Sequence, residues 1–97
     1  MTFKEKERLI VYLMTKYTFL KANYNTEFYC LESDLVLLIN YALRHLDEDS
    51  LRIINNDFIE IKKKYWWNEY YSRTTYYRLK NKAMMLFINC LHNRKMV

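Results

Sequence analysis

The 97-residue chain contains no glycine and no proline, although average usage would supply about twelve of the two together. Tight β-hairpins need glycine in their turns, and phosphate-binding loops need it where the backbone approaches the ligand. Their absence argues against hairpin-built sheets, sandwiches and glycine-rich nucleotide loops. No apolar run reaches the roughly 18 residues typical of a membrane-spanning helix, so no membrane partner is expected.

Cysteine and histidine are also scarce, with two of each. Cys30 and Cys90 lie far apart and form no C-x-x-C pair, so they indicate buried free thiols in a reducing compartment, not a metal site. His45 and His92 stand alone, and neither lies near a plausible nucleophile. We therefore expect no catalytic residue, no metal and no cofactor. The charged N-terminus does not resemble a secretory signal, so a cytoplasmic location is expected.

What the chain does contain is apolar residues at helical spacing. Hydrophobic residues make up 52% of it and aromatic residues 18%, enough to fill one modest core. The prediction is an all-α, compact domain of four to five helices with a C-terminal helix-turn-helix. Residues 1–97 form this single domain, with a helical pair over 1–46, a helix-turn-helix-like part over 47–92 and a frayed basic tail over 93–97.

The first two helices are delimited by local signals. Phe3–Ala22 should form the first, because Thr2 and Glu5 make a capping-box pattern. Residues 23–32 should form a loop or irregular turn, with Phe28 and Leu31 as anchors. The second helix is predicted from Ser33 to His45 or Leu46. Its interior is apolar nearly all round, which indicates the central and most buried helix.

Three acids, at 47–49, predict the start of a third helix, because negative charge is favourable at a helix N-terminus. Lys62, Lys63 and Lys64 should close this helix, where they are also candidate phosphate contacts. One of the adjacent Trp66 and Trp67 should be in the core and the other at the surface; the sequence does not choose between them. We expect one shared core that includes Leu43, Ile54, Phe58, Tyr76, Leu79 and Ala83.

The segment Tyr70–Ala83, Y-Y-S-R-T-T-Y-Y-R-L-K-N-K-A, is the most informative stretch. Ser72 is a predicted N-cap. On the following helix one face is apolar, comprising Tyr76, Leu79, Ala83, Leu86, Phe87 and Cys90. The opposite face carries residue types that contact phosphates and base edges, namely Arg73, Thr74, Tyr77, Arg78 and Asn81. With the short segment Tyr65–Tyr71 before it, this is the layout of a helix-turn-helix. The alternative is a plain amphipathic helix with a solvated basic face.

Charge is distributed unevenly along the chain. Residues 1–61 hold seven Lys/Arg and ten Asp/Glu, whereas residues 62–97 hold nine Lys/Arg and one acid, Glu69. An A/T-rich genome, which the abundance of Lys, Asn, Tyr and Ile indicates, would raise Lys everywhere. It does not explain why acids nearly vanish after Glu60. A basic third attached to an acidic remainder is the pattern of a surface that binds a polyanion.

Residues 42–91 resemble region 4 of sigma factors through two stretches. These are A-L-R-H-L-D-E-D-S-L-R-I-I-N-N-D-F-I and W-W-N-E-Y-Y-S-R-T-T-Y-Y-R-L-K-N-K-A. The second is closer still to ArpU-type phage late-transcription regulators, whose final helix often reads like S-R-S-T-Y-Y-R-x-K-x-K-A. The resemblance covers about half of the chain and implies sequence-specific binding of double-stranded DNA in transcription control. The chain departs from the pattern where bulky residues replace the usual small residue and glycine, at Trp67, Glu69, Tyr70 and Tyr71.

Two functions follow as hypotheses. The first is a small DNA-binding transcription regulator, with the DNA-binding residues Lys62, Lys63, Lys64, Ser72, Arg73, Thr74, Tyr77, Arg78, Lys80 and Asn81. The alternative is a non-enzymatic helical interaction module that binds RNA polymerase, another protein or itself through Tyr and Trp anchors. RNA binding by stacking on tyrosines is a third option. A homodimer is compatible with the first, because helix-turn-helix proteins often occupy two half-sites.

Overall fold

The computed structural model describes residues 1–22 and 30–95, and these residues form helices and connections without a β-strand. The elements are α1 (Phe3–Ala22), α2 (Cys30–Arg44), α3 (Glu48–Ile54), a π-helical turn η1 (Asn55–Ile59), a 3-10 turn η2 (Trp66–Glu69) and α4 (Arg73–Lys95). The prediction of a compact all-α domain is confirmed. None of the helices in the described ranges has the length and apolarity to cross a membrane.

Side-chain caps explain where α1 and α3 begin. The Thr2 backbone N–H donates to Glu5 Oε1 at 2.8 Å, and the Glu5 N–H donates to Thr2 Oγ1 at 3.1 Å, which is the predicted capping box. At α3, Asp47 Oδ1 accepts from the Ser50 N–H at 2.7 Å. This hydrogen bond lowers the pKa of the Asp47 carboxyl. Both starts were predicted, because the signals lie within four residues of each other in the sequence.

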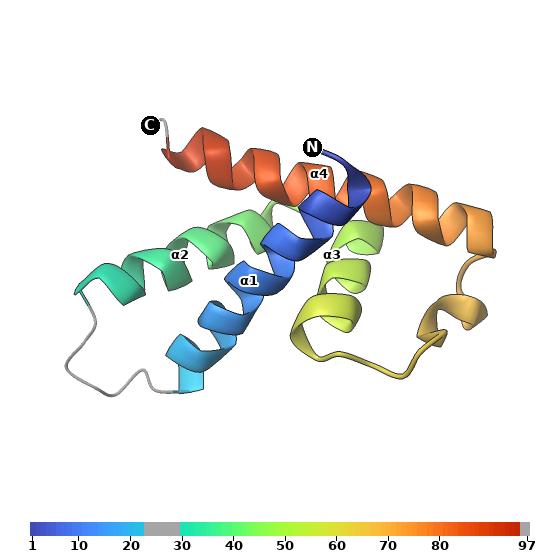
Figure 1. Cartoon of the computed structure of the whole chain (residues 1–97), viewed down its shortest axis with the longest axis horizontal. Coiled ribbons are helices and arrows are strands. Elements are labelled where there is room, and N and C mark those ends of the chain that lie inside the picture. Colours follow the sequence, from blue (N-terminus) through green and yellow to red (C-terminus); the bar gives the residue numbers. More distant parts are fainter. Residues whose placement is uncertain (23–29, 96–97) are drawn as a thin grey trace.

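The helix at the centre of the fold is α4, because α1, α2 and α3 all pack against it. In Figure 1 it runs along the top of the molecule, with α1 crossing in front and α2 and α3 below on either side. The prediction that the second helix is central was wrong. One stripe of α2 (Val36, Ile39 and Ala42) is buried, whereas Leu37 is 63% exposed. Apolar residues around the whole helix therefore do not mean burial around the whole helix.

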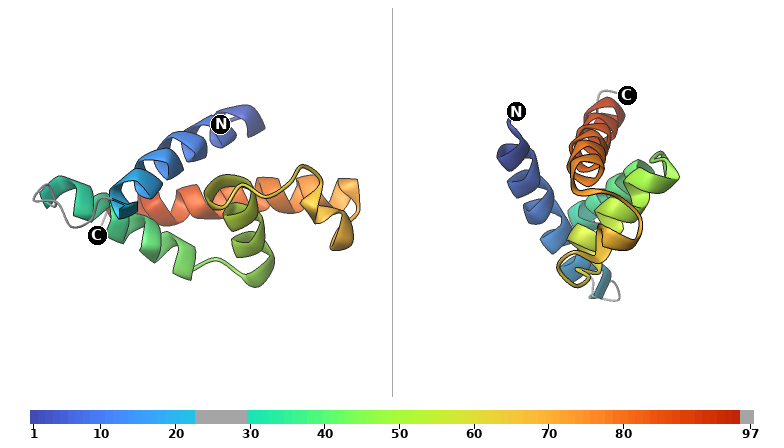
Figure 2. Two further views of the ribbon diagram at one scale, coloured as in Figure 1. Left: turned by 90° about the horizontal axis from the view of Figure 1, so that it is seen from below. Right: turned by 90° about the vertical axis from the view of Figure 1, so that its right-hand side faces the viewer.

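The core divides into two clusters. The larger joins α1, α2, the end of α3, η1 and α4 and includes Ile54, Phe58 and Ala83, with Leu43 packed against it. The smaller comprises Ile53, Trp67 and Tyr76, with Leu79 packed against it. The single core expected from the sequence is thus split, and Tyr76 and Leu79 belong to the smaller cluster. The division arises because α4 extends beyond the end of the bundle, where η2 covers it (Figures 1 and 2).

The third helix ends earlier than predicted, so Lys62, Lys63 and Lys64 do not close it. After Ile54 the chain widens into the π-turn η1, in which the Glu60 N–H donates to the Asn55 carbonyl at 2.8 Å. Ile61 then adopts the left-handed conformation, with φ of 49°, and Tyr65 does so with φ of 65°. Glycine is the residue that adopts such angles at least cost, and the chain has none.

Two further boundaries differ from the predictions. The second helix begins at Cys30, earlier than Ser33. Most of the predicted loop, including Phe28, lies outside the described residues. The tail expected over 93–97 is helical as far as Lys95, and residues 96–97 lie outside the description. The radius of gyration is 13.9 Å, above the roughly 12.5 Å of an average compact domain of this length, in keeping with the projecting end of α4.

Candidate nucleic-acid interface

The start of α4 is fixed by Ser72, as the sequence predicted. The Ser72 Oγ accepts from the Thr75 backbone N–H at 3.2 Å and donates to Thr75 Oγ1 at 2.9 Å. The Ser72 carbonyl accepts from the Tyr76 N–H at 2.8 Å. The hydroxyl is thus used inside the cap. Its contribution to the proposed DNA-binding set is to position the residues that follow.

The segment before α4 is a single 3-10 turn, η2, held to α4 by aromatic contacts. The Trp67 ring stacks on the Tyr76 ring, with centroids 4.5 Å apart and planes 9° apart, and Trp67 is 7% exposed. Trp66 is half-buried, and its Nε1 donates to Asp57 Oδ1 at 2.7 Å. The structure therefore answers the question that the sequence left open: Trp67 is the core tryptophan.

A second set of contacts ties the turn at Tyr70–Ser72 to α3. The Tyr71 hydroxyl donates to Asp49 Oδ1 at 2.7 Å and accepts from the Arg52 guanidinium at 2.9 Å. Burial raises the pKa of the Tyr71 hydroxyl. The guanidinium also lies 4.7 Å from the centroid of the Tyr70 ring. Trp67, Tyr70 and Tyr71, which are bulky where the region 4 pattern has small residues, therefore form the contacts that hold this turn.

Lys80 is buried, so its prediction as a phosphate contact is wrong. It is 7% exposed. Its Nζ lies 2.9 Å from Glu7 Oε2 and 3.3 Å from Asp57 Oδ2, which makes a two-carboxylate ion pair. The ammonium also lies 5.8 Å from the Phe3 ring centroid and 5.2 Å from that of Phe58. A charge enclosed in this way cannot reach a phosphate group.

The reason for this burial is tertiary. Lys80 follows Tyr76 by one helical turn and shares its inward face, yet lysine is rarely buried unless it is paired. Its partners lie on α1 and η1. Asp57 also accepts a hydrogen bond from the Tyr76 hydroxyl. Burial, and then the hydrogen bond to Asp57, raise the pKa of Tyr76 far above that of a free tyrosine. Asp57 in η1 is thus bonded to Trp66 of η2 and Tyr76 of α4. Through its ion pair with Glu7, Lys80 joins α1 to the same group.

The predicted reading face is exposed along its full length. Arg73, Thr74, Tyr77, Arg78 and Asn81 all lie at the surface. Tyr77 is 44% exposed, and the Arg73 guanidinium lies 6.0 Å from its ring centroid. The start of α4, where this face begins, extends past α3 in Figure 1. The sequence placed them correctly on the exposed side of the helix, because the 3.6-residue period separates them from the buried face.

The start of α1 borders this face, which the sequence did not reveal. Lys6 Nζ donates to Asn81 Oδ1 at 2.7 Å, and the Phe3 and Tyr77 ring centroids are 6.2 Å apart. Glu5 is used in the α1 cap and Glu7 in the Lys80 ion pair. The acids of this segment are thus engaged within the protein. The sequence does alternate lysines and glutamates after Phe3, but this pattern does not show which of them face α4, because that depends on where α1 docks.

Two further bases near the start of α1 are exposed. Lys4 and Arg8 are exposed on α1, and within the described residues neither has an ion-pair partner. On the other side of α4, Lys82 Nζ lies 3.8 Å from Asp47 Oδ2. Lys6 is thus the base of α1 that lies beside the exposed face of α4, whereas Lys82 on the α3 side is paired with Asp47.

The three consecutive lysines lie in the connection between η1 and η2 and are exposed. Lys62 Nζ is 3.2 Å from Glu60 Oε1. A hydrogen bond from Asn55, and then the contact with Lys62, lower the pKa of the Glu60 carboxyl. Lys64 lies 5.3 Å from the centroid of the Tyr65 ring. These lysines remain accessible to a phosphate backbone, although they do not belong to a helix end.

No group of three or more metal-binding side chains occurs in the described part of the chain. Asp57 and Glu7 are committed to Lys80, and the other paired acids lie on the surface. Comparison with known proteins finds no matching family model, no matching curated protein and no matching solved structure.

Proposed function

We propose that the chain is a small DNA-binding protein of transcription control, with α4 as the recognition helix of a helix-turn-helix related to sigma-factor region 4. The observation that carries the proposal is the exposed polar face at the projecting start of α4. Arginine, threonine and asparagine on that face are residue types that hydrogen-bond base edges in the major groove. The turn η2 takes the place of the first helix of the motif.

The dimensions suit a major groove. Arg73 and Asn81 are eight residues apart, about 12 Å along a helix, or roughly four base pairs. Arg78 lies on the fully exposed side, where its guanidinium can pair with guanine O6 and N7. Lys6 beside the face and the exposed lysines after Ile61 are assigned the phosphate contacts, which give most of the affinity of such proteins.

Asn81 is restricted in this role. A bidentate pair with adenine uses both the carbonyl and the amide of the asparagine side chain, but Oδ1 already accepts from Lys6. Asn81 can pair with adenine in this manner only if the Lys6 ammonium leaves Oδ1 and turns to a phosphate instead. Arg78 has no such competitor within the described chain, so we assign the principal base contact to Arg78.

The test is selection of bound sequences from random duplex DNA, followed by affinity measurements on the enriched site. Arg78→Ala should weaken binding to that site by about 1–3 kcal/mol and leave binding to random duplex less affected. Lys63→Ala should weaken both and flatten the salt dependence by about one unit. Lys16→Ala, an exposed lysine further along α1, is the matched control and should change neither. No enriched site, together with unchanged affinity in the Arg73, Arg78 and Asn81 alanine variants, would refute the proposal.

The second candidate is a protein-binding module, which the aromatic surface favours. Tyr65, Tyr70 and Tyr77 are 56%, 55% and 44% exposed around η2, and tyrosine is frequent among interface anchors. Salt separates the two functions. DNA binding weakens steeply as salt rises, whereas an interface anchored by aromatic residues changes little. Retained binding to RNA polymerase at high salt, lost in Tyr70→Ala, would favour this candidate.

A further inference from the structure

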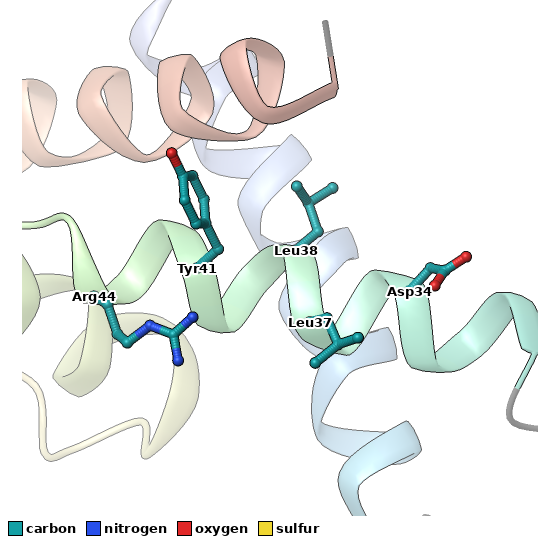
Figure 3. Close-up of a pocket in the computed structure, with 5 residues that line it drawn as sticks. All are labelled: Asp34, Leu37, Leu38, Tyr41 and Arg44. Atoms are coloured by element: carbon teal, nitrogen blue, oxygen red, sulfur yellow. The ribbon is translucent and has the colours of Figure 1, made fainter. Parts of the chain in front are cut away.

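Four side chains along α2 have a symmetric arrangement. Asp34, Leu37, Tyr41 and Arg44 follow one another at intervals of three, four and three residues, and they line a shallow hollow of 400 Å³ together with Leu38. Figure 3 shows these residues along α2, with the two charged ones at its ends. Intervals of three and four mark the contact positions of a coiled coil.

This stripe of four side chains is complementary to a reversed copy of itself. Turning α2 end for end about Ile39 returns the same order of intervals. In an antiparallel pair, Asp34 of one copy lies level with Arg44 of the other, and Leu37 lies level with Tyr41. The opposite arrangement holds at the other end of the pair. Two ion pairs therefore enclose two Leu–Tyr contacts, which is the self-complementarity that a twofold interface requires.

Three of these residues are exposed in the single chain and Tyr41 is half-buried, which fits such a contact. Leu37 is 63% exposed, and Asp34 and Arg44 are exposed. Within the described residues, neither Asp34 nor Arg44 has an ion-pair partner. We propose that the chain forms an antiparallel homodimer through this α2 stripe, defined as Asp34, Leu37, Tyr41 and Arg44.

The proposed dimer does not depend on the proposed function. The α2 stripe belongs to the half of the molecule opposite the projecting start of α4 (Figure 1). Pairing through α2 therefore leaves both copies of the α4 face open. Association can be measured without DNA, so a failure of the dimer and a failure of DNA binding would be seen in separate experiments.

The experiment is sedimentation equilibrium of the full chain over a concentration series, without DNA. The wild type should move from the 12.1 kDa monomer to twice that mass as concentration rises. Asp34→Arg places two arginines level with each other at both ends of the pair. It should raise the dissociation constant about tenfold or more. Arg44→Asp should do the same by placing two aspartates together.

The combined variant Asp34→Arg/Arg44→Asp exchanges the charges and restores both ion pairs, so its dissociation constant should return to near that of the wild type. Lys16→Asp is the control for a charge reversal on another helix and should leave association unchanged. A helical circular dichroism spectrum for each variant shows that it is folded. A monomer at every concentration would overturn the proposal, and so would a dimer that neither single reversal weakens or that the combined variant fails to restore.

Discussion

The buried ammonium of Lys80 offers the sharpest test of the structure, because the sequence predicted the opposite environment. Lys80→Met keeps most of the apolar stem that packs near Phe58 and removes only the charge. Asp57 then loses its counter-ion in a position where its side chain is 13% exposed. Glu7, at 37%, can be rehydrated. Asp57 therefore dominates the cost of the substitution.

The expected loss is about 3 kcal/mol, the low end of the range for breaking a buried ion pair. It lies at the low end because Asp57 keeps its hydrogen bonds from Trp66 and Tyr76. Domains of this size have total stabilities of about 5–15 kcal/mol. The variant should thus remain folded at room temperature but melt on the order of 15 °C lower.

Urea unfolding followed by circular dichroism measures the effect, and Lys82→Met is the matched control. Lys82 lies two residues further along α4, is 54% exposed and has only the 3.8 Å contact with Asp47. Its loss should cost under about 0.5 kcal/mol. Adding Asp57→Asn to Lys80→Met removes the orphaned charge and should recover about 1–3 kcal/mol. Equal stabilities for Lys80→Met and Lys82→Met would refute the burial of Lys80.

Three further outcomes follow from the same structure. Phe58→Ala should lower stability by about 3–5 kcal/mol in urea unfolding, because the ring is 7% exposed, and a loss below about 0.5 kcal/mol would show that it faces solvent. Above about pH 10 the unfolded chain loses the Tyr76 proton while the folded chain keeps it, so the free energy of unfolding should fall by up to about 1.4 kcal/mol per pH unit. Tyr76→Phe should lack this part of the dependence of stability on pH. The same pH dependence in both proteins would contradict the raised pKa of Tyr76. Ile61→Gly should raise the free energy of unfolding by about 0.5–1 kcal/mol, because glycine adopts the left-handed backbone conformation of this residue without strain and the Ile61 side chain is 73% exposed. Lys63→Gly should lower it by a similar amount. Equal losses in both variants would exclude strain at Ile61.

The sequence by itself determined the features that depend on near neighbours. The caps at Thr2, Asp47 and Ser72 each join residues three positions apart, so their residue types are sufficient to place them. The helical period likewise separated the buried face of α4 from its exposed face. The all-α fold class follows from the same period in every apolar segment and from the absence of glycine and proline.

The tertiary structure decided what distant residues do to one another. Lys80 is buried because Glu7, 73 positions away, docks beside it. Asn81 is engaged because Lys6, 75 positions away, reaches it. The same docking brings Lys6, from the acidic part of the sequence, beside the α4 face. Charge counted along a chain cannot show which acids are used internally, because pairing depends on how helices pack in space.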